Sequence, residues 1–228
     1  MSTIADNIQL VSSRIQAATA AAGRSENSVQ LLAVSKTKPA QALREAYAAG
    51  LRDFGENYLQ EALGKQLELA DLPLIWHFIG PIQSNKTRAI AEHFDWVHSV
   101  DRLKIAQRLS EQRPAELPPL NICIQVNVSG EASKSGCTPA DLPALAEAIS
   151  TLPRLKLRGL MAIPEPTEDR AEQDAAFAAV QRLQASLNLP LDTLSMGMSH
   201  DLESAIAQGA TWVRISTALF GARDYGQQ

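Results

Sequence analysis

Cysteine is scarce in this sequence, which has two in 228 residues, Cys123 and Cys137. They do not form the closely spaced pair of a metal-binding motif, so we expect two reduced thiols, as is typical of a cytoplasmic protein. Long apolar runs are also missing. No stretch approaches the roughly 18 residues of a membrane span, and the N-terminus lacks the basic and then apolar segments of a secretion signal. We therefore expect neither membrane insertion nor export.

An excess of positive charge is absent too, since 21 Lys and Arg residues are outnumbered by 25 Asp and Glu residues. A nucleic-acid-binding protein usually has a basic surface, so we expect a small molecule as the ligand, and no nucleic acid. Hydrophobic residues make up 45% of the chain and charged residues 20%, which is typical of a folded protein. No linker or low-complexity segment interrupts the chain, which predicts one domain over residues 1–228.

The sequence does contain a repeated alternation of short apolar runs and helical patterns. An amphipathic helix opens the chain, with Ile4, Ile8, Val11 and Ile15 at helical spacing. Eight strand-like runs follow, at residues 29–35, 53–55, 74–79, 96–100, 121–128, 157–163, 194–196 and 212–215. Since helical stretches separate them, the pattern predicts an α/β fold, a parallel (β/α)8 barrel of the TIM type with an extra N-terminal helix. The alternative is an open doubly wound sheet, but its glycine fingerprint is absent after the first strand.

Lys36 ends the first strand-like run, directly after Leu31-Leu32-Ala33-Val34-Ser35. Alternation along a strand places this lysine on the face of Leu32 and Val34, at the mouth of the barrel. A lysine in apolar surroundings loses its proton readily and can condense with an aldehyde to a Schiff base. The alternative, that the amine extends into solvent with its stem along the strand end, is the commoner arrangement.

The loops after the last two strands contain hydroxyl residues, Ser199 in one loop and Ser216 and Thr217 in the other. In a barrel of this type these two loops often bind phosphate. Ser199 is also in position to be the N-cap of a helix over residues 202–207, whose first amides would face an anion. Capping or an ordinary turn explains each hydroxyl taken singly, but their combination at this place favours a phosphate site.

Two further polar residues lie within strands. Alternation places Arg214 on the face of Trp212 and Ser216, pointing inward, and no acidic residue stands at the matching strand end to pair with it. An acceptor on a ligand would fill that place. His77 has two interpretations, a hydrogen-bonded core residue or a catalytic acid or base.

A lysine ending the first strand, a phosphate site after the last two strands and an inward arginine together suggest pyridoxal 5′-phosphate (PLP). Segments typical of one family run nearly the length of the chain, among them residues 33–37 (Ala-Val-Ser-Lys-Thr), 54–61 (Phe-Gly-Glu-Asn-Tyr-Leu-Gln-Glu), 76–86 and 194–199. In these segments the sequence resembles the pyridoxal phosphate homeostasis protein family. The fold of that family is similar to the barrel domain of alanine racemase, fold-type III of the PLP proteins without the C-terminal β-domain.

The resemblance implies a set of cofactor-binding residues: Lys36, Asn57, His77, Ser199, Arg214, Ser216 and Thr217. Lys36 would hold PLP as an internal aldimine, and Arg214 would face its pyridine nitrogen. The three hydroxyl residues would hold the phosphate, while Asn57 and His77 would lie near the ring. The family usually has glycine where this chain has Ser216, so the assignment of Thr217 is the better supported of the two.

A cation beside the pyridine nitrogen disfavours protonation of that nitrogen, which makes the ring a poorer electron sink. Racemases of this barrel type take a second base from the partner subunit's C-terminal domain, and we expect none here, since the chain stops at Gln228 soon after the last barrel strand. We therefore expect a non-catalytic, cytoplasmic, monomeric protein that binds PLP reversibly, without a metal. It would contribute to intracellular PLP and amino-acid homeostasis and could supply apo-enzymes. The alternatives are a weak PLP-dependent amino-acid racemase with Lys36 as base, and a phosphate-ester enzyme without PLP.

Overall fold

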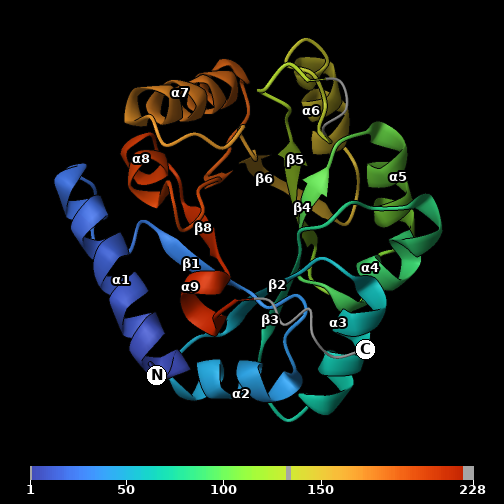
Figure 1. Ribbon diagram of the computed structural model, residues 1–228. Coiled ribbons are helices and arrows are strands. Elements are labelled where there is room, and N and C mark those ends of the chain that lie inside the picture. The colour runs from blue at the N-terminus through green and yellow to red at the C-terminus, as the bar shows by residue number, and fades with distance from the viewer. Residues whose placement is uncertain (1, 132–134, 223–228) are drawn as a thin grey trace.

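Residues 2–131 and 135–222, which the computed structural model describes, form a closed barrel of eight parallel strands (Figure 1). Each strand pairs with the next along the chain, and β8 pairs with β1 to close the barrel. The strands are β1 (Gln30–Val34), β2 (Asp53–Glu56), β3 (Ile75–Phe78), β4 (Trp96–Val100), β5 (Leu120–Gln125), β6 (Leu155–Met161), β7 (Thr193–Ser195) and β8 (Trp212–Ile215). The predicted (β/α)8 barrel is confirmed. The predicted single domain over residues 1–228 extends beyond the described residues.

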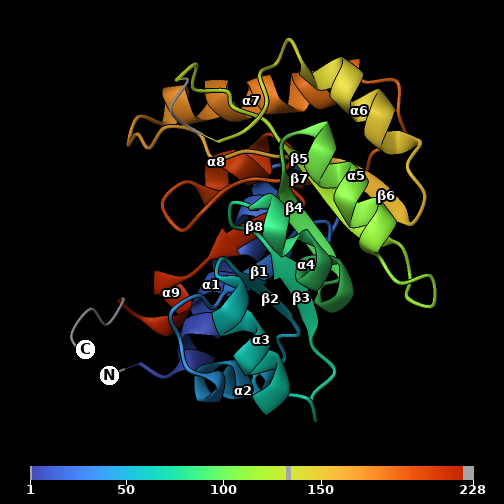
Figure 2. The ribbon, with the colours of Figure 1, turned by 90° about the vertical axis from the view of Figure 1, so that its right-hand side faces the viewer.

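Helices separate the strands and surround the barrel, with α6 and α7 at one side and α2 and α3 at the other (Figure 2). They are α1 (Ile4–Ala21), α2 (Ala40–Ala48), α3 (Leu59–Glu68), α4 (Thr87–His93), α5 (Leu103–Gln112), α6 (Leu142–Ser150), α7 (Arg170–Ser186), α8 (Leu202–Ala207) and α9 (Thr217–Phe220). A short 3-10 helix, η1 (Ser84–Lys86), precedes α4.

The N-terminal helix α1 begins with a capping box, in which Thr3 Oγ1 accepts from the Asp6 amide at 3.0 Å and Asp6 Oδ2 accepts from the Thr3 amide at 3.2 Å. It packs against α2, α8 and α9. Arg14 pairs with Glu203 of α8 at 2.8 Å. The helix after β8 has only four residues, so α1 covers the side of the barrel where a longer last helix would lie.

The strands separate two apolar layers. Ile122, Ile124 and Val126 lie in the outer layer, between barrel and helices. The inner layer contains Leu32, Trp96, Cys123, Met161 and Trp212. Side chains along the fifth strand therefore alternate between the outer and the inner layer. Cys123 and Cys137 are free thiols, and burial raises the pKa of Cys123 to about 12, which leaves an unreactive thiol.

The fifth strand ends earlier than predicted, at Gln125 instead of residue 128. Val126 forms an isolated bridge with Cys137, and the Asn127 amide donates to the Cys137 carbonyl at 2.8 Å. The Val126 amide still donates to the Met161 carbonyl of β6 at 3.0 Å, but the Asn127 amide bonds to the following loop, a contact that local hydrophobicity does not indicate.

Candidate functional site

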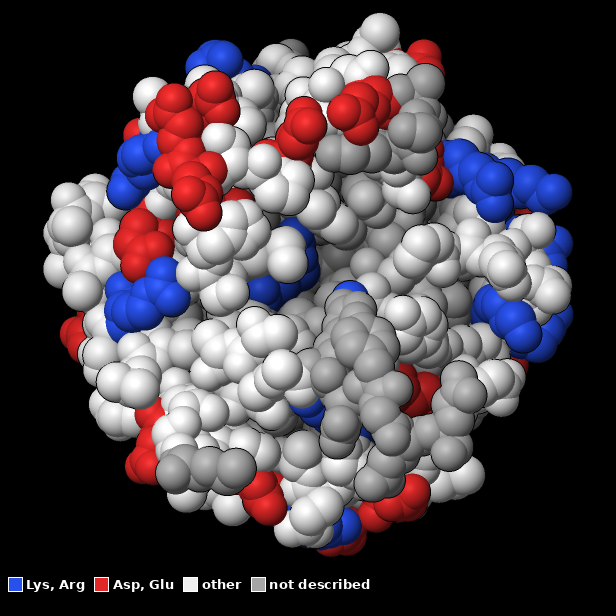
Figure 3. All heavy atoms as spheres, in the orientation of Figure 1, with Lys and Arg blue, Asp and Glu red and all other residues white. Residues whose placement is uncertain are grey.

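Lys36 lies two residues beyond the end of β1. Leu32 belongs to the inner layer and Ala33 to the outer layer, so alternation places Lys36 on the inner side, where it is half-buried. Thr37 has a left-handed φ of 66°, which turns the chain away from the strand and toward α2. Figure 3 shows the face on which α9 lies. It is hollowed at its centre, with lysine and arginine atoms on the wall of the hollow.

The turn that carries Lys36 is held by three charged side chains, Glu56, Glu61 and Lys65, which we call the turn clamp. Lys65 Nζ donates to the Ser35 carbonyl at 2.7 Å and to Glu56 Oε1 at 2.6 Å. Glu61 Oε1 accepts from the Thr37 amide at 2.7 Å. The backbone on both sides of Lys36 is therefore fixed by groups of β2 and α3.

Glu56 of the turn clamp is fully buried. Burial raises its pKa to about 7, although Lys65 acts in the opposite direction. The Oε2 atoms of Glu56 and Glu61 are both buried without a hydrogen-bond partner. Sequence reasoning missed the clamp. The four-residue spacing of Glu61 and Lys65 on a helix is the signal that could have found that pair, but nothing local marks Lys65 as buried.

Arg214 of β8 is buried inside the barrel, as predicted, with 5% of its surface exposed. Its Nη1 donates to Ser195 Oγ at 2.8 Å and its Nη2 donates to the Ala162 carbonyl at 3.1 Å. Among the described residues no carboxylate pairs with it. Burial lowers its pKa to about 10, so it stays charged at neutral pH. A buried guanidinium with donors left over fits an acceptor on a ligand.

Asn57 follows β2, two residues after Gly55, and is half-buried. A Cβ on Gly55 would meet the inner side chains Leu32 and Ile79, so Asn57 continues along the inner side. Its Oδ1 is buried without a hydrogen-bond partner. Since a buried acceptor normally has a donor, this orphaned oxygen fits a donor group on a ligand.

The three predicted phosphate-binding hydroxyls lie in the loops after β7 and β8. Ser199 and Ser216 are half-buried and Thr217 is exposed. Ser216 has a φ of −122°, so its position does not require the positive φ that favours glycine. The backbone therefore gives no reason to discard Ser216 as a candidate.

The prediction that Ser199 is an N-cap was wrong. Helix α8 begins at Leu202 and its N-cap is Asp201. Residues 198–201 form a turn in which Asp201 Oδ1 accepts from the Met198 amide at 2.7 Å, and the Ser199 carbonyl accepts from Arg14 Nη2 at 2.9 Å. The helix begins at the predicted residue, but this turn, which Arg14 of α1 contacts, places Ser199 before the N-cap position. The contact comes from the other end of the chain and leaves no local signal.

His77 lies inside the barrel with none of its surface exposed. Its Nε2 is 2.8 Å from Asp53 Oδ1 and its Nδ1 is 2.9 Å from His98 Nε2. Both ring nitrogens are thus used by protein groups, and the expectation that His77 lies near a cofactor ring stays a prediction. The arrangement agrees with the alternative interpretation, a hydrogen-bonded core histidine.

None of the described helices is long and apolar enough to cross a membrane. Within residues 2–131 and 135–222, no group of three or more His, Cys, Asp or Glu side chains is arranged to hold a metal ion.

The sequence model of the family "Alanine racemase, N-terminal domain" matches residues 3–224. The chain is 79% identical over 226 residues to the pyridoxal phosphate homeostasis protein of Pseudomonas aeruginosa, with 99% of this chain and 98% of that protein covered. It is 55% identical over 234 residues to the protein of that name from Escherichia coli K12, with both chains fully covered. The chain belongs to the pyridoxal phosphate homeostasis protein family.

Solved structures also superpose on this chain. PipY of Synechococcus elongatus, in a structure with PLP bound, superposes with a TM-score of 0.80 at 46% identity, covering 91% of this chain and 100% of PipY. Alanine racemase of Corynebacterium glutamicum superposes with a TM-score of 0.68 at 17% identity, covering 99% of this chain and 62% of the racemase. At that identity the racemase shares the barrel fold alone with this pyridoxal phosphate homeostasis protein family member.

Proposed function

We propose that this chain binds PLP reversibly through Lys36 and contributes to intracellular PLP and amino-acid homeostasis without catalysing a reaction. The observation that carries the proposal is Arg214, a buried guanidinium without a carboxylate partner among the described residues, in the barrel whose mouth carries Lys36. Membership of the pyridoxal phosphate homeostasis protein family and the PLP-bound structure of PipY support it.

The described residues fit PLP. The Lys36 amine would condense with the aldehyde group, so that a C=N bond forms and one water is released. Arg214 offers unused N–H donors to the ring nitrogen, and the orphaned Asn57 oxygen offers an acceptor. We assign Ser199, Ser216 and Thr217 to the phosphate group, because they lie in the two loops that bind phosphate in many barrels of this type.

When bound, PLP can delocalise negative charge from carbon into a protonated pyridine ring. A guanidinium has only donors, and the pKa of Arg214, about 10, keeps it charged at neutral pH. Arg214 therefore favours an unprotonated ring nitrogen and a weak electron sink. This is the physical reason to expect a carrier of the cofactor and no enzyme.

The first test is spectroscopic. Purified protein incubated with PLP is expected to gain an absorbance band in the near-ultraviolet to violet, and Lys36→Ala is expected to lose it. Lys38→Ala is the matched control and should keep the band, because Lys38 Nζ donates to the Gly221 and Ala222 carbonyls at 3.3 and 2.9 Å. Borohydride reduction and peptide mass analysis should place the cofactor on Lys36. Wild-type protein that stays colourless and unmodified would contradict the proposal.

A weak amino-acid racemase is the second candidate, because the alanine racemase N-terminal domain model matches residues 3–224. Prolonged incubation of the PLP-loaded protein with a panel of L-amino acids, followed by chiral chromatography, separates the two. A carrier gives no D-amino acid, whereas turnover that Lys36→Ala abolishes would establish an enzyme.

Delivery of PLP to other proteins is tested by transfer. The PLP-loaded protein and free PLP, at equal concentration, are mixed with an apo-enzyme and the recovery of its activity is followed. The mixture also contains an amine that traps free PLP. Recovery of activity that this amine does not reduce supports delivery, whereas recovery that it abolishes would show release into solution only. The expected monomer is checked by light scattering of the same sample.

A further inference from the structure

A chain of hydrogen bonds crosses the interior of the barrel and ends on Arg214. It begins at Asp53 Oδ1, which is 2.8 Å from His77 Nε2, and continues from His77 Nδ1 to His98 Nε2 at 2.9 Å. His98 Nδ1 is 2.8 Å from Ser195 Oγ, and Ser195 Oγ is 2.8 Å from Arg214 Nη1. The five side chains come from five strands, and we call them the interior chain.

The carboxylate end fixes the direction of the bonds in the interior chain when both imidazoles are neutral. A carboxylate only accepts, so His77 donates from Nε2 to Asp53 Oδ1. A neutral His77 then accepts at Nδ1 from His98 Nε2, and a neutral His98 accepts at Nδ1 from the Ser195 hydroxyl. Arg214 has only donors, so its Nη1 donates to Ser195 Oγ, which agrees with this direction. Both neutral imidazoles then carry their hydrogen on Nε2.

The surroundings of the two histidines favour the same neutral state. Neither ring is exposed. Burial lowers the pKa of both, for His98 to well below its usual value, and Asp53 only partly opposes this effect at His77. Trp96 stacks on His77 at 5.4 Å between ring centroids, and Trp212 meets it edge-on at 4.9 Å. An imidazolium among these apolar rings would be costly to bury.

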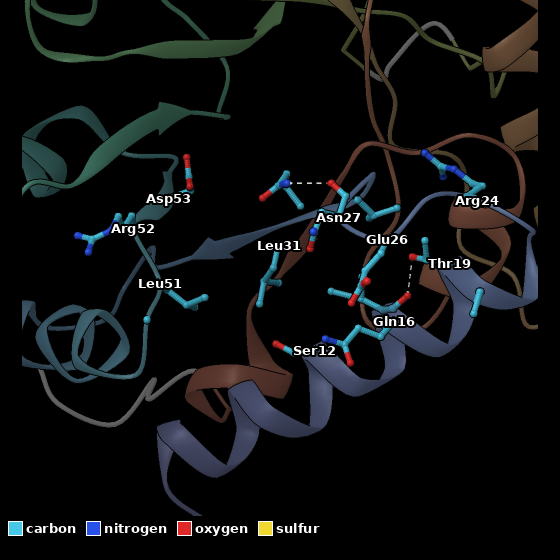
Figure 4. A pocket seen from close by; sticks show the side chains of 15 residues that line it. Ser12, Gln16, Thr19, Arg24, Glu26, Asn27, Leu31, Leu51, Arg52 and Asp53 are labelled. Carbon is cyan, nitrogen blue, oxygen red and sulfur yellow. Dashed lines mark hydrogen bonds between the residues drawn. The ribbon is translucent and has the colours of Figure 1, made fainter.

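The other end of the interior chain opens to solvent. Asp53 borders a cavity of about 580 Å³ between α1 and the first residues of β1 and β2, where Arg24 and Glu26 also lie (Figure 4). The Asp53 side chain is 23% exposed, so its negative charge is partly solvated. The interior chain thus joins a partly solvated anion to a buried cation through three neutral groups.

We infer that Asp53, His77, His98 and Ser195 are positioning residues, which fix the orientation of Arg214 toward the ring of bound PLP. The identity of the ligand in this inference rests on the proposed function. The direction of the hydrogen bonds in the interior chain is independent of it. Ser195 takes one hydrogen of Nη1 and the Ala162 carbonyl one of Nη2, so the plane of the guanidinium is set by two acceptors. Without the Ser195 hydroxyl, Arg214 keeps one acceptor and can rotate.

The direction of the chain is tested without PLP, by NMR of protein carrying ¹⁵N-labelled histidine. His77 and His98 are expected to show protonated Nε2 and unprotonated Nδ1, with no titration between pH 6 and 8. A hydrogen on Nδ1 of either buried ring, or titration of either in this range, would overturn the inference.

The positioning role is tested with PLP. Ser195→Ala is expected to weaken PLP binding about ten-fold, the effect of losing one hydrogen bond to a charged group, and to shift the absorbance maximum of the bound cofactor. Ser195→Thr keeps the hydroxyl and should show the PLP affinity and the absorbance maximum of the wild-type protein. Ser110→Ala is the matched control, because the Ser110 hydroxyl is also buried and donates to the Pro153 carbonyl, away from the interior chain.

The two proposals fail in different ways. If wild-type protein does not bind PLP but the histidine hydrogens lie as inferred, the proposed function is wrong and the direction of the chain stands. If Ser195→Ala binds PLP with unchanged affinity and spectrum, the positioning role is wrong and PLP binding stands. Should Ser195→Ala fail to fold, the NMR measurement on wild-type protein still decides whether the chain runs as described.

Discussion

The turn clamp and the interior chain are two buried polar networks that serve neighbouring parts of one site, and they are built in opposite ways. The clamp holds two carboxylates and an ammonium, with one oxygen of Glu56 and one of Glu61 left without a partner. The interior chain has charges only at its ends, and every nitrogen of its two imidazoles has a partner. One network depends on charge, the other on the direction of hydrogen bonds.

This difference predicts opposite responses to pH. A buried ion pair costs desolvation, which the attraction between its partners only partly offsets. The folded state therefore favours the protonated, uncharged form of Glu56. In the interior chain the folded state favours unprotonated histidines. The predictions below test this contrast, first on the clamp and then on the chain.

The largest effect is expected for Lys65→Met. It leaves the Glu56 carboxylate buried without its ammonium, and breaking such a pair typically costs about 3–5 kcal/mol. Urea unfolding at pH 8 measures the loss. Lys156→Met, at an exposed lysine, is the control and should change the free energy of unfolding by less than about 0.5 kcal/mol.

The double variant Glu56→Gln/Lys65→Met completes that measurement. Because it removes both charges, it should recover most of the stability that Lys65→Met loses. A double variant as unstable as the single one would show that the clamp acts through packing and that its charges do not matter.

The second-largest effect is expected in the pH dependence of the free energy of unfolding, to which Glu56 contributes. Its pKa in the folded protein, about 7, lies above the usual 4.5, so the folded state binds a proton more tightly between these values. The resulting stabilisation is fully present below about pH 4.5, is lost as the pH rises to about 7, and amounts to about 3 kcal/mol. Glu56→Gln should lose this dependence in urea unfolding from pH 5 to 8, whereas Glu45→Gln, at an exposed position, should keep it.

The third effect is a change of stability with pH in the direction opposite to that of Glu56. The pKa values of His77 and His98 are lowered in the folded protein, so unfolding takes up protons below the usual pKa of 6.5. Each histidine then makes stability fall with decreasing pH by up to about 1.4 kcal/mol per pH unit. His98→Gln should lessen this slope between pH 6.5 and 5, and His93→Gln, at an exposed histidine, should not. An equal slope in both variants would refute a neutral interior chain.

The sequence was sufficient to predict the barrel, because strand and helix periods are local and each unit repeats the same pattern. The inner and outer sides of β5 agree with simple alternation along a strand. Features set by contacts distant in sequence could not be predicted. Strand β5 stops at Gln125, and the Asn127 amide pairs with Cys137 of the following loop. The N-cap of α8 is Asp201 in place of Ser199, which lies in a turn that Arg14 contacts.

The site divides in the same way. The lysine after β1 and the inward arginine of β8 could be named from alternation and strand ends, and the family segments gave them roles. The turn clamp and the interior chain could not be named, because each is defined by side chains that meet only when the barrel closes. His98 and Ser195, for example, are 97 residues apart in sequence and 2.8 Å apart in space. Alternation gives the side on which each lies and not its partner.

The smallest effect is expected for Asp53→Asn, which separates charge from hydrogen-bond direction. The amide oxygen can still accept from His77 Nε2, and the charge that is lost is partly solvated. We expect a loss of less than about 1 kcal/mol in urea unfolding. The hydrogens on His77 and His98 should stay on Nε2. A loss as large as that of Lys65→Met would mean that the interior chain, like the turn clamp, depends on its charge, and the contrast between the two networks would be gone.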